Sequence, residues 1–302
     1  MRHLQQSACL VAVLITAACG AAAPAAAPAR SHAAAAGPSP RAQVSAQARA
    51  AGPKPKVSVT YYRAADGSRV TLARFRGAVS YRLHSGSVDP GPAALAIVRA
   101  GPRIRGRERH RLLAAFNGGF LLSAGVGGFE QEGHVIRPLS DGLASLVIDS
   151  SGAASIGAWG SGLPRPGEPV FSVRQNLRLL VRHGRPARAA ANWRLWGPTL
   201  GGGEYVARSA LGENAAGELI YAGSMATDPA DLAAALVHAG ARTAMQLDIN
   251  PEWVQLDVAP APGRGLRAAL PAQVRPPDQY LVGWARDFIS VLGPGPGMPA
   301  GG

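Results

Sequence analysis

The clearest hydrophobic pattern in this chain covers residues 218–254, where two apolar runs of strand length flank a segment with helical spacing. Asp228 and Pro229 suit the start of a helix, and Gly240 suits its end. The apolar side chains between them repeat on one helical face: Leu232, Ala235, Leu236 and Ala239. The pattern predicts a strand, a helix and a parallel strand in a right-handed crossover. It places Asp248 at the carboxyl edge of the second strand.

Most other segments between residues 57 and 292 alternate apolar and polar residues with the period of two that is typical of strands. VSVTYYR and VTLARFR flank Asp66-Gly67 and predict a hairpin. LLAAF predicts a short buried strand before Asn117, and VFSVRQNLRLLV predicts one further strand. A strand-rich chain with few helices and one β-α-β crossover near residues 218–249 indicates a single α+β domain over residues 57–292. Residues 293–302 are expected to form a loose tail.

The N-terminus has the pattern of a bacterial export signal, with Arg2 before a short apolar run that ends at Ala18. The run is too short for a stable transmembrane helix. Cys19 follows small residues, as at a lipoprotein processing site, which predicts a signal peptide over residues 1–18 and a lipid on Cys19. The alternative is an ordinary signal, cleaved later, that releases a secreted soluble protein. Residues 19–56 are rich in Ala and Pro and predict a disordered linker.

The net charge of +13 comes almost entirely from arginine, since only Lys54 and Lys56 are lysines. No basic segment is interleaved with aromatic residues, which argues against a nucleic-acid partner. Arginines occupy the odd positions from Arg99 to Arg111 except position 101, and in an extended segment they would form one basic face. Such a face is either a solvated edge that discourages strand pairing or a contact for an anionic polymer or headgroup.

Several polar residues are candidates for chemistry. Asn117 follows a buried strand, and Gly118 and Gly119 would let the backbone approach a ligand, although a tight turn also explains them. Glu130 and Glu132 would share one face of a strand, as a general acid or base or as solvated carboxylates.

Three segments, taken in order, resemble the phosphodiester glycosidase domain, a family that includes an enzyme removing N-acetylglucosamine from a phosphodiester. The matching segments are LLAAFNGGF, ARSALG and MQLDINPEW, and they contain Asn117, Arg208 and Asp248. Ser209 stands where the family has Thr, and Gln246 where it has Asn. The family's glycines after the aspartate are replaced by Ile249 to Glu252, which points to a different substrate or to loss of catalysis.

The resemblance implies an exported hydrolase that cleaves a sugar-1-phosphodiester. Arg208 would bind the phosphate, Asp248 would act as a base or stabilise a developing cation, and Asn117 would orient sugar or water. Glu252 or Glu132 would be the second carboxylate. The expected substrate contacts are Gly118, Gly119, Ser209, Asn250 and Trp253. The sequence identifies no definite cofactor, and a divalent cation at Asp248 is compatible with this chemistry. The alternative is a non-catalytic envelope module that binds an anionic glycopolymer.

Overall fold

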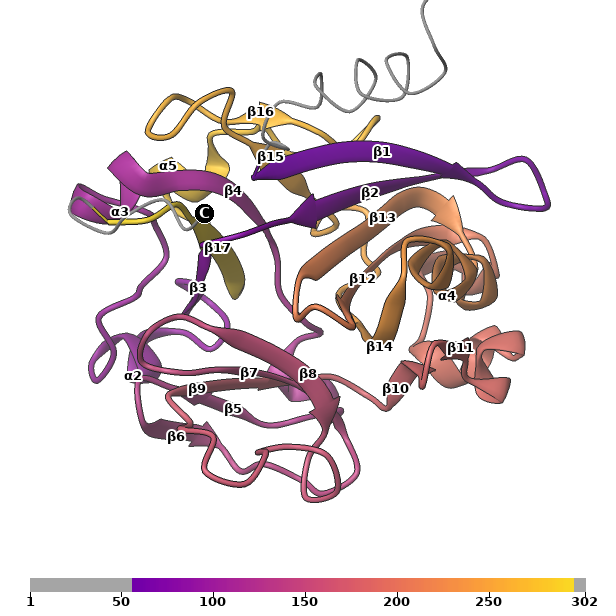
Figure 1. Cartoon of the computed structure of the whole chain (residues 1–302), viewed down its shortest axis with the longest axis horizontal. Helices are drawn as coiled ribbons and strands as arrows, with labels where there is room; N and C mark the ends of the chain where they lie inside the picture. The colour runs from indigo at the N-terminus through magenta and orange to yellow at the C-terminus, as the bar shows by residue number, and fades with distance from the viewer. Residues whose placement is uncertain (1–55, 296–302) are drawn as a thin grey trace, which may run out of the picture. The chain divides into compact units, whose positions relative to one another are not determined.

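The computed structural model describes residues 56–295, which form three β-sheets and four α-helices (Figure 1). The seven-stranded sheet contains, in spatial order, β1 (Val57–Arg63), β2 (Arg69–Phe75), β13 (Leu219–Thr227), β12 (Val206–Asn214), β14 (Ala241–Gln246), β10 (Leu179–Arg182) and β11 (Arg185–Pro186). A strand-rich single domain with few helices confirms the predicted α+β class.

The other two sheets have five strands each. One has the order β16 (Arg267–Ala268), β15 (Leu256–Val258), β4 (Leu112–Asn117), β17 (Phe288–Leu292) and β3 (Ser80–His84). The other has the order β6 (His134–Arg137), β5 (Phe129–Gln131), β9 (Ser172–Gln175), β7 (Ala144–Ile148) and β8 (Ala154–Ala158). The remaining helices are α2 (Pro92–Leu95), α3 (Gly106–Arg111) and α5 (Gln279–Val282), and short 3₁₀ turns lie at Leu122–Ala124, Arg188–Ala191, Trp193–Trp196 and Leu200–Gly202.

The predicted crossover is present. The helix α4 (Pro229–His238) joins β13 to β14, and both strands pair antiparallel with β12, so they run parallel to each other with β12 between them. Asp228 caps α4 by accepting a hydrogen bond from the Asp231 N–H at 2.7 Å. The buried face of α4, which includes Leu232 and Leu236, covers the seven-stranded sheet (Figure 1).

The main hydrophobic core lies on the other face of that sheet and joins it to both five-stranded sheets. Phe116, Phe129 and Leu211, one from each sheet, are all fully buried in it. Because β4 ends at Asn117 inside this core, the segment after it starts at a rigid point.

Two sequence predictions about local structure are wrong. Residues 172–182 form two strands in different sheets, separated by a turn in which Leu177 has a φ of 55°. Residues 106–111 form α3, so the extended segment that would have placed the arginines on one basic face is not present there. Glu108 explains the helix, since it turns inward and its carboxylate lies 2.7 Å from the buried His84 ring. Tertiary contacts therefore override the alternation of arginines.

The predicted signal segment, Cys19 and residues 19–55 of the linker lie outside the described residues, as do residues 296–302 of the tail. Gly293, expected in the loose tail, is held by two hydrogen bonds with Arg111, at 2.7 and 2.8 Å. Within residues 56–295, none of the helices has the length and apolar character needed to cross a bilayer.

We expect Leu236→Ala to lower the free energy of unfolding by about 2–5 kcal/mol, because the side chain is fully buried between α4 and the sheet. Urea denaturation followed by circular dichroism measures this change. Leu195→Ala is the matched control, since Leu195 is 56% exposed and should cost less than about 0.5 kcal/mol. Equal losses in the two variants would contradict the packing described for α4.

Candidate functional site

Three segments that are distant in the sequence meet at the end of β4. The Asn117 amide donates to Ser209 Oγ at 2.9 Å, and Ser209 Oγ donates to the Asp248 carbonyl at 2.7 Å. The Asp248 N–H donates to the Gly118 carbonyl at 3.0 Å. The sequence predicted that Asn117, Arg208 and Asp248 would converge. Asn117 and Asp248 do meet, but the residue that joins them is Ser209, the neighbour of Arg208.

Asn117 is 2% exposed and its amide is used inside the protein. Its Oδ1 accepts from the Tyr221 hydroxyl at 3.0 Å and from the Gln255 N–H at 3.1 Å, while its Nδ2 donates to Ser209 and Gly118. A side chain with these partners orients the surrounding segments rather than a ligand. Ser209 is also fully buried, and its hydroxyl likewise connects segments of the protein rather than facing a ligand.

Asp248 lies two residues beyond β14, and its carboxylate is held from two directions. Oδ1 accepts from the Ile249 and Asn250 N–H groups at 2.7 and 3.0 Å, and Oδ2 accepts from Arg286 at 3.0 Å. Only 5% of the residue is exposed. Burial raises the pKa of Asp248 to about 6, although Arg286 and the two backbone N–H groups act in the opposite direction. A carboxyl with this pKa can gain or lose a proton near neutral pH.

Arg286 and Asp287 form the part of the site that the sequence prediction missed. Arg286 binds Asp248, donates to the Gly119 carbonyl at 3.1 Å and lies 3.6 Å from the Asp89 carboxylate. Asp287 pairs with the buried Arg174 at 2.8 Å. The available signal was the same one that identified Asp248, namely charged residues inside an apolar run, here WARDFISVL.

Gly118 and Gly119 are needed for this ion-pair cluster rather than for close approach of a ligand. A Cβ at position 118 would collide with the Asp287 carboxylate, and one at position 119 would lie 2.7 Å from Arg174 Cζ. The expectation that the two glycines face a substrate is therefore corrected. Their small size lets the backbone pack directly on the Arg174–Asp287 pair.

Asp248 and Arg286 open onto a pocket of about 150 Å³. Asn250 and Trp253, both predicted from the sequence as contacts, also line it, and the Trp253 ring lies 5.3 Å from the Arg286 guanidinium. The other lining residues are apolar: Phe120, Leu121, Ala124, Pro198, Leu200 and Ile249. The pocket thus combines a charged floor with an apolar wall.

Arg208 does not line this pocket. It is fully buried, and it donates to the Thr227 carbonyl at 3.2 Å and to Gln246 Oε1 and the Glu204 carbonyl at 3.4 Å. Within residues 56–295 it has no carboxylate at ion-pair distance, and burial lowers its pKa to about 10. The segment 197–204 contributes Pro198 and Leu200 to the pocket wall, and its last residue, Glu204, accepts a hydrogen bond from Arg208 through its carbonyl.

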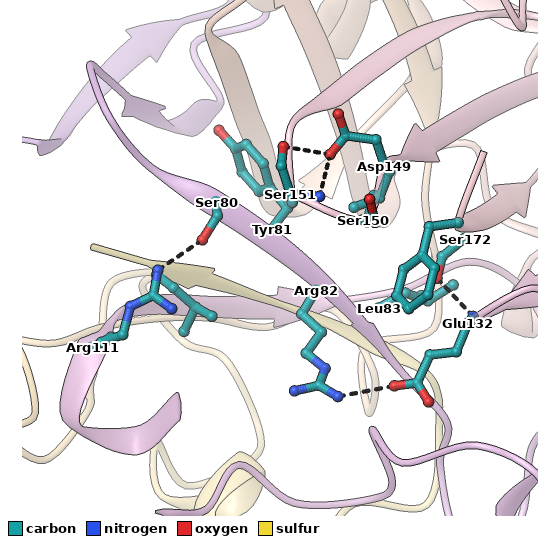
Figure 2. Close-up of a pocket in the computed structure, with 14 residues that line it drawn as sticks. Ser80, Tyr81, Arg82, Leu83, Arg111, Glu132, Asp149, Ser150, Ser151 and Ser172 are labelled. Carbon is teal, nitrogen blue, oxygen red and sulfur yellow. Dashed lines mark hydrogen bonds and ion pairs between the residues drawn. The ribbon is translucent and has the colours of Figure 1, made fainter. Parts of the chain in front are cut away.

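Glu132 lies in a different pocket, of about 290 Å³, shown in Figure 2. It occupies the turn after β5 with a φ of 52°, so the prediction that it shares a strand face with Glu130 is wrong. Its carboxylate accepts from Arg82 at 2.9 Å and from the Arg99 N–H at 2.6 Å. Burial opposes ionisation, but these hydrogen bonds outweigh it and lower the pKa of Glu132. These hydrogen bonds hold Glu132 within the fold. Glu132 does not lie beside Asp248.

Glu252 is also directed away from the pocket. Its side chain is 44% exposed and pairs with Arg275 at 2.6 Å. Only its backbone N–H contacts the site, by donating to Asn250 Oδ1 at 2.9 Å. Neither carboxylate predicted as the second catalytic acid therefore reaches Asp248 in this arrangement.

The donor groups around Asp248 do not suit a divalent cation, because both carboxylate oxygens already accept hydrogen bonds and Arg286 occupies the adjacent space. In the part of the chain that the structure describes, no cluster of three or more His, Cys, Asp or Glu side chains is arranged to bind a metal.

We expect Gly119→Ala to destabilise the protein by about 1–3 kcal/mol, because the added methyl would overlap the buried Arg174 guanidinium. Thermal and urea unfolding report the change. Gly265→Ala is the control, since a Cβ there meets no atom within 4 Å. If Gly119→Ala left the free energy of unfolding unchanged, the side chains of the ion-pair cluster would be able to move at little cost.

No family model and no curated protein matches this chain. Among solved structures, the catalytic domain of zebrafish N-acetylglucosamine-1-phosphodiester α-N-acetylglucosaminidase, auto-inhibited by its pro-peptide, is similar with a TM-score of 0.50. The sequences are 15% identical, and the match covers 79% of this chain and 82% of that one. A hypothetical protein from Synechocystis matches with a TM-score of 0.45 and 12% identity, over 79% of this chain and 62% of that one. At this identity, the chain resembles the zebrafish glycosidase domain in fold.

Proposed function

We propose that this protein is a hydrolase that cleaves the glycosidic C–O bond of a sugar-1-phosphodiester, with Asp248 as its acid–base group. The observation that carries the proposal is the Asp248 carboxyl, which is buried at the floor of a pocket, has a pKa near 6 and contacts Arg286 at 3.0 Å. The fold it shares with the zebrafish glycosidase domain supports the reaction class.

The charges around the pocket suit this reaction. Three carboxylates, Asp89, Asp248 and Asp287, surround two arginines, Arg174 and Arg286. The local excess of one negative charge favours positive charge on the sugar ring. Cleavage of a glycosidic bond passes through an oxocarbenium-like transition state, so this excess stabilises the charge that develops on a ring that is uncharged in the ground state, while Arg286 faces the anionic phosphate.

Asp248 takes the proton of the attacking water, and Arg286 contacts an oxygen of the departing phosphate. The phosphate needs little protonation to leave, so one carboxylate can supply most of the acid–base chemistry. Among the described residues, Asp248 is the one carboxylate that lines the pocket, and Asp89 acts in this scheme from outside the lining, by orienting Arg286 at 3.6 Å. Arg208, which does not line the pocket, does not contact the phosphate in this scheme.

In this proposal the protein acts outside the cytoplasm. The predicted signal directs its export, and the lipid on Cys19, joined to the domain by the linker, holds it at the membrane. The sequence pattern of residues 1–56 supports this placement.

We expect Asp248→Asn to lower kcat/KM for a model sugar-1-phosphate diester by about 10²–10⁴-fold, since the amide cannot accept the proton of water. Release of free sugar is the measurement. Glu252→Gln is the matched control and should retain activity, because Glu252 pairs with Arg275 outside the pocket. Wild-type turnover that survives Asp248→Asn would overturn the assignment.

The same activity should depend on pH with a defined sign. As a base, Asp248 must be ionised, so kcat/KM should rise with pH through about 6. Arg286 lowers the pKa of Asp248. Arg286→Gln removes this effect and should shift the rise to higher pH as well as weaken binding. A pH profile of Arg286→Gln that overlays the wild-type profile would exclude Asp248 as the titrating group.

A second candidate function is binding of an anionic envelope glycopolymer. The observation that favours it is a group of exposed arginines around α3 that form no ion pair among residues 56–295: Arg103, Arg105, Arg107 and Arg109. Binding through them would be independent of the Asp248 pocket.

For this second function we expect that binding to a polyanionic glycan weakens about tenfold or more between 50 and 300 mM salt, because exposed charges are screened. Replacing the four arginines by glutamine should abolish binding without changing the melting temperature. Retained binding in that variant, or no salt dependence, would exclude this surface.

A further inference from the structure

The wall of the Asp248 pocket is more apolar than the binding of a sugar alone would require. Of the ten residues that line it, only Asp248, Asn250 and Arg286 are polar or charged, and Asp248 and Arg286 bind each other. A sugar ring presents several hydroxyls, each of which loses free energy if it is buried without a partner. The pocket therefore offers few partners for a second sugar or for another polar group.

Two leucines extend the apolar surface from the wall to the outside. Leu121 and Leu200 are 43% and 66% exposed, and they come from different segments on the rim of the same pocket. Leu200 lies in the segment 197–204, where Gly197 packs against the Phe120 ring and the Ile249 side chain. Exposed large apolar residues gathered at a pocket mouth are typical of a ligand-binding rim.

The floor supplies a position for an acidic head group. Arg286 lines the pocket, and its Nη2 donates to Asp248 and to the Gly119 carbonyl. Its Nε is buried and faces Asp89 at 3.6 Å, so an oxygen of a ligand would meet the part of the guanidinium that borders the pocket rather than Nε. Because Asp89 and Asp248 repel a second negative charge, a phosphodiester with one charge fits better than a phosphomonoester with up to two.

We infer that the pocket takes an amphiphilic phosphodiester whose aglycone is an aliphatic chain. The phosphate oxygen accepts from Arg286, the sugar carbon lies toward Asp248 and Asn250, and the chain lies along Phe120 and Ile249 to the rim formed by Leu121 and Leu200. This inference rests on the proposed function and adds the substrate class to it. The binding contribution of the chain is the hydrophobic effect, which increases with each methylene that leaves water.

The test measures binding first, so that it does not depend on turnover. The full chain is titrated calorimetrically with dimethyl phosphate, methyl butyl phosphate and methyl octyl phosphate, each below its aggregation concentration. We expect the octyl ester to bind at least about tenfold more tightly than the butyl ester, given a few-fold per buried methylene. Leu121→Ser and Leu200→Ser should each reduce that ratio to about threefold.

Val135→Ser is the matched control, because Val135 is 59% exposed on β6 and does not line the pocket. It should leave the octyl-to-butyl ratio unchanged. Since all three substituted residues are exposed, each variant should keep the wild-type melting temperature. Equal affinities for the three esters, or a ratio that both leucine variants leave unchanged, would overturn the inference.

Hydrolysis separates this inference from the proposed function. With sugar-1-phosphate diesters of methanol and octanol, we expect KM for the octyl diester to be at least about tenfold lower. If the methyl diester is hydrolysed and KM does not depend on chain length, only the inference of an aliphatic aglycone is overturned. Chain-dependent binding that the leucine variants reduce, without turnover of either diester, would retain the ligand class and overturn the hydrolase.

Discussion

The arrangement of the site depends on two buried arginine–carboxylate pairs that meet at the turn after β4. Arg174 binds Asp287, and Arg286 binds Asp248. All four side chains are at least nine-tenths buried, so removing one partner would leave an uncompensated charge in the interior. The backbone of Gly118 and Gly119 lies between the pairs and is fixed by both. The pocket floor is rigid because these charges constrain one another.

The same burial and ion pairing also determine the pKa of Asp248. Asp248 is buried enough for its pKa to rise, yet Arg286 and two backbone N–H groups keep the ionised form accessible. Asp257, a second buried carboxyl on β15, has a pKa raised to about 7 because of burial, opposed by hydrogen bonds from Gln273 and Gln255. It has no arginine partner among the described residues and is absent from the pocket lining. A raised pKa alone therefore does not define a site, whereas a raised pKa beside a cation at a pocket floor does suit acid–base chemistry.

The strand end that bears Asp248 differs from the pattern of the family that the sequence resembles. Ile249 and Pro251 occupy positions where the resembling family has glycines, and Ile249 forms part of the apolar pocket wall. Ile249 places a buried side chain beside Asp248, where a glycine would have none. The same segment keeps the two N–H groups that hold the Asp248 carboxylate. Asp248 is thus held by backbone N–H groups while the pocket wall beside it is hydrophobic.

The sequence by itself determined the α+β class, the crossover around α4 and the meeting of the three segments that contain Asn117, Arg208 and Asp248. Periodicity, helix caps and strand ends are local signals, and the family resemblance placed three of them together. Only the tertiary structure decided that Arg286 rather than Arg208 reaches Asp248, that Glu132 lies in another pocket, and that Gly118 and Gly119 pack on an ion pair. Those outcomes depend on which side chains face each other across sheets, and neither spacing nor composition contains that information.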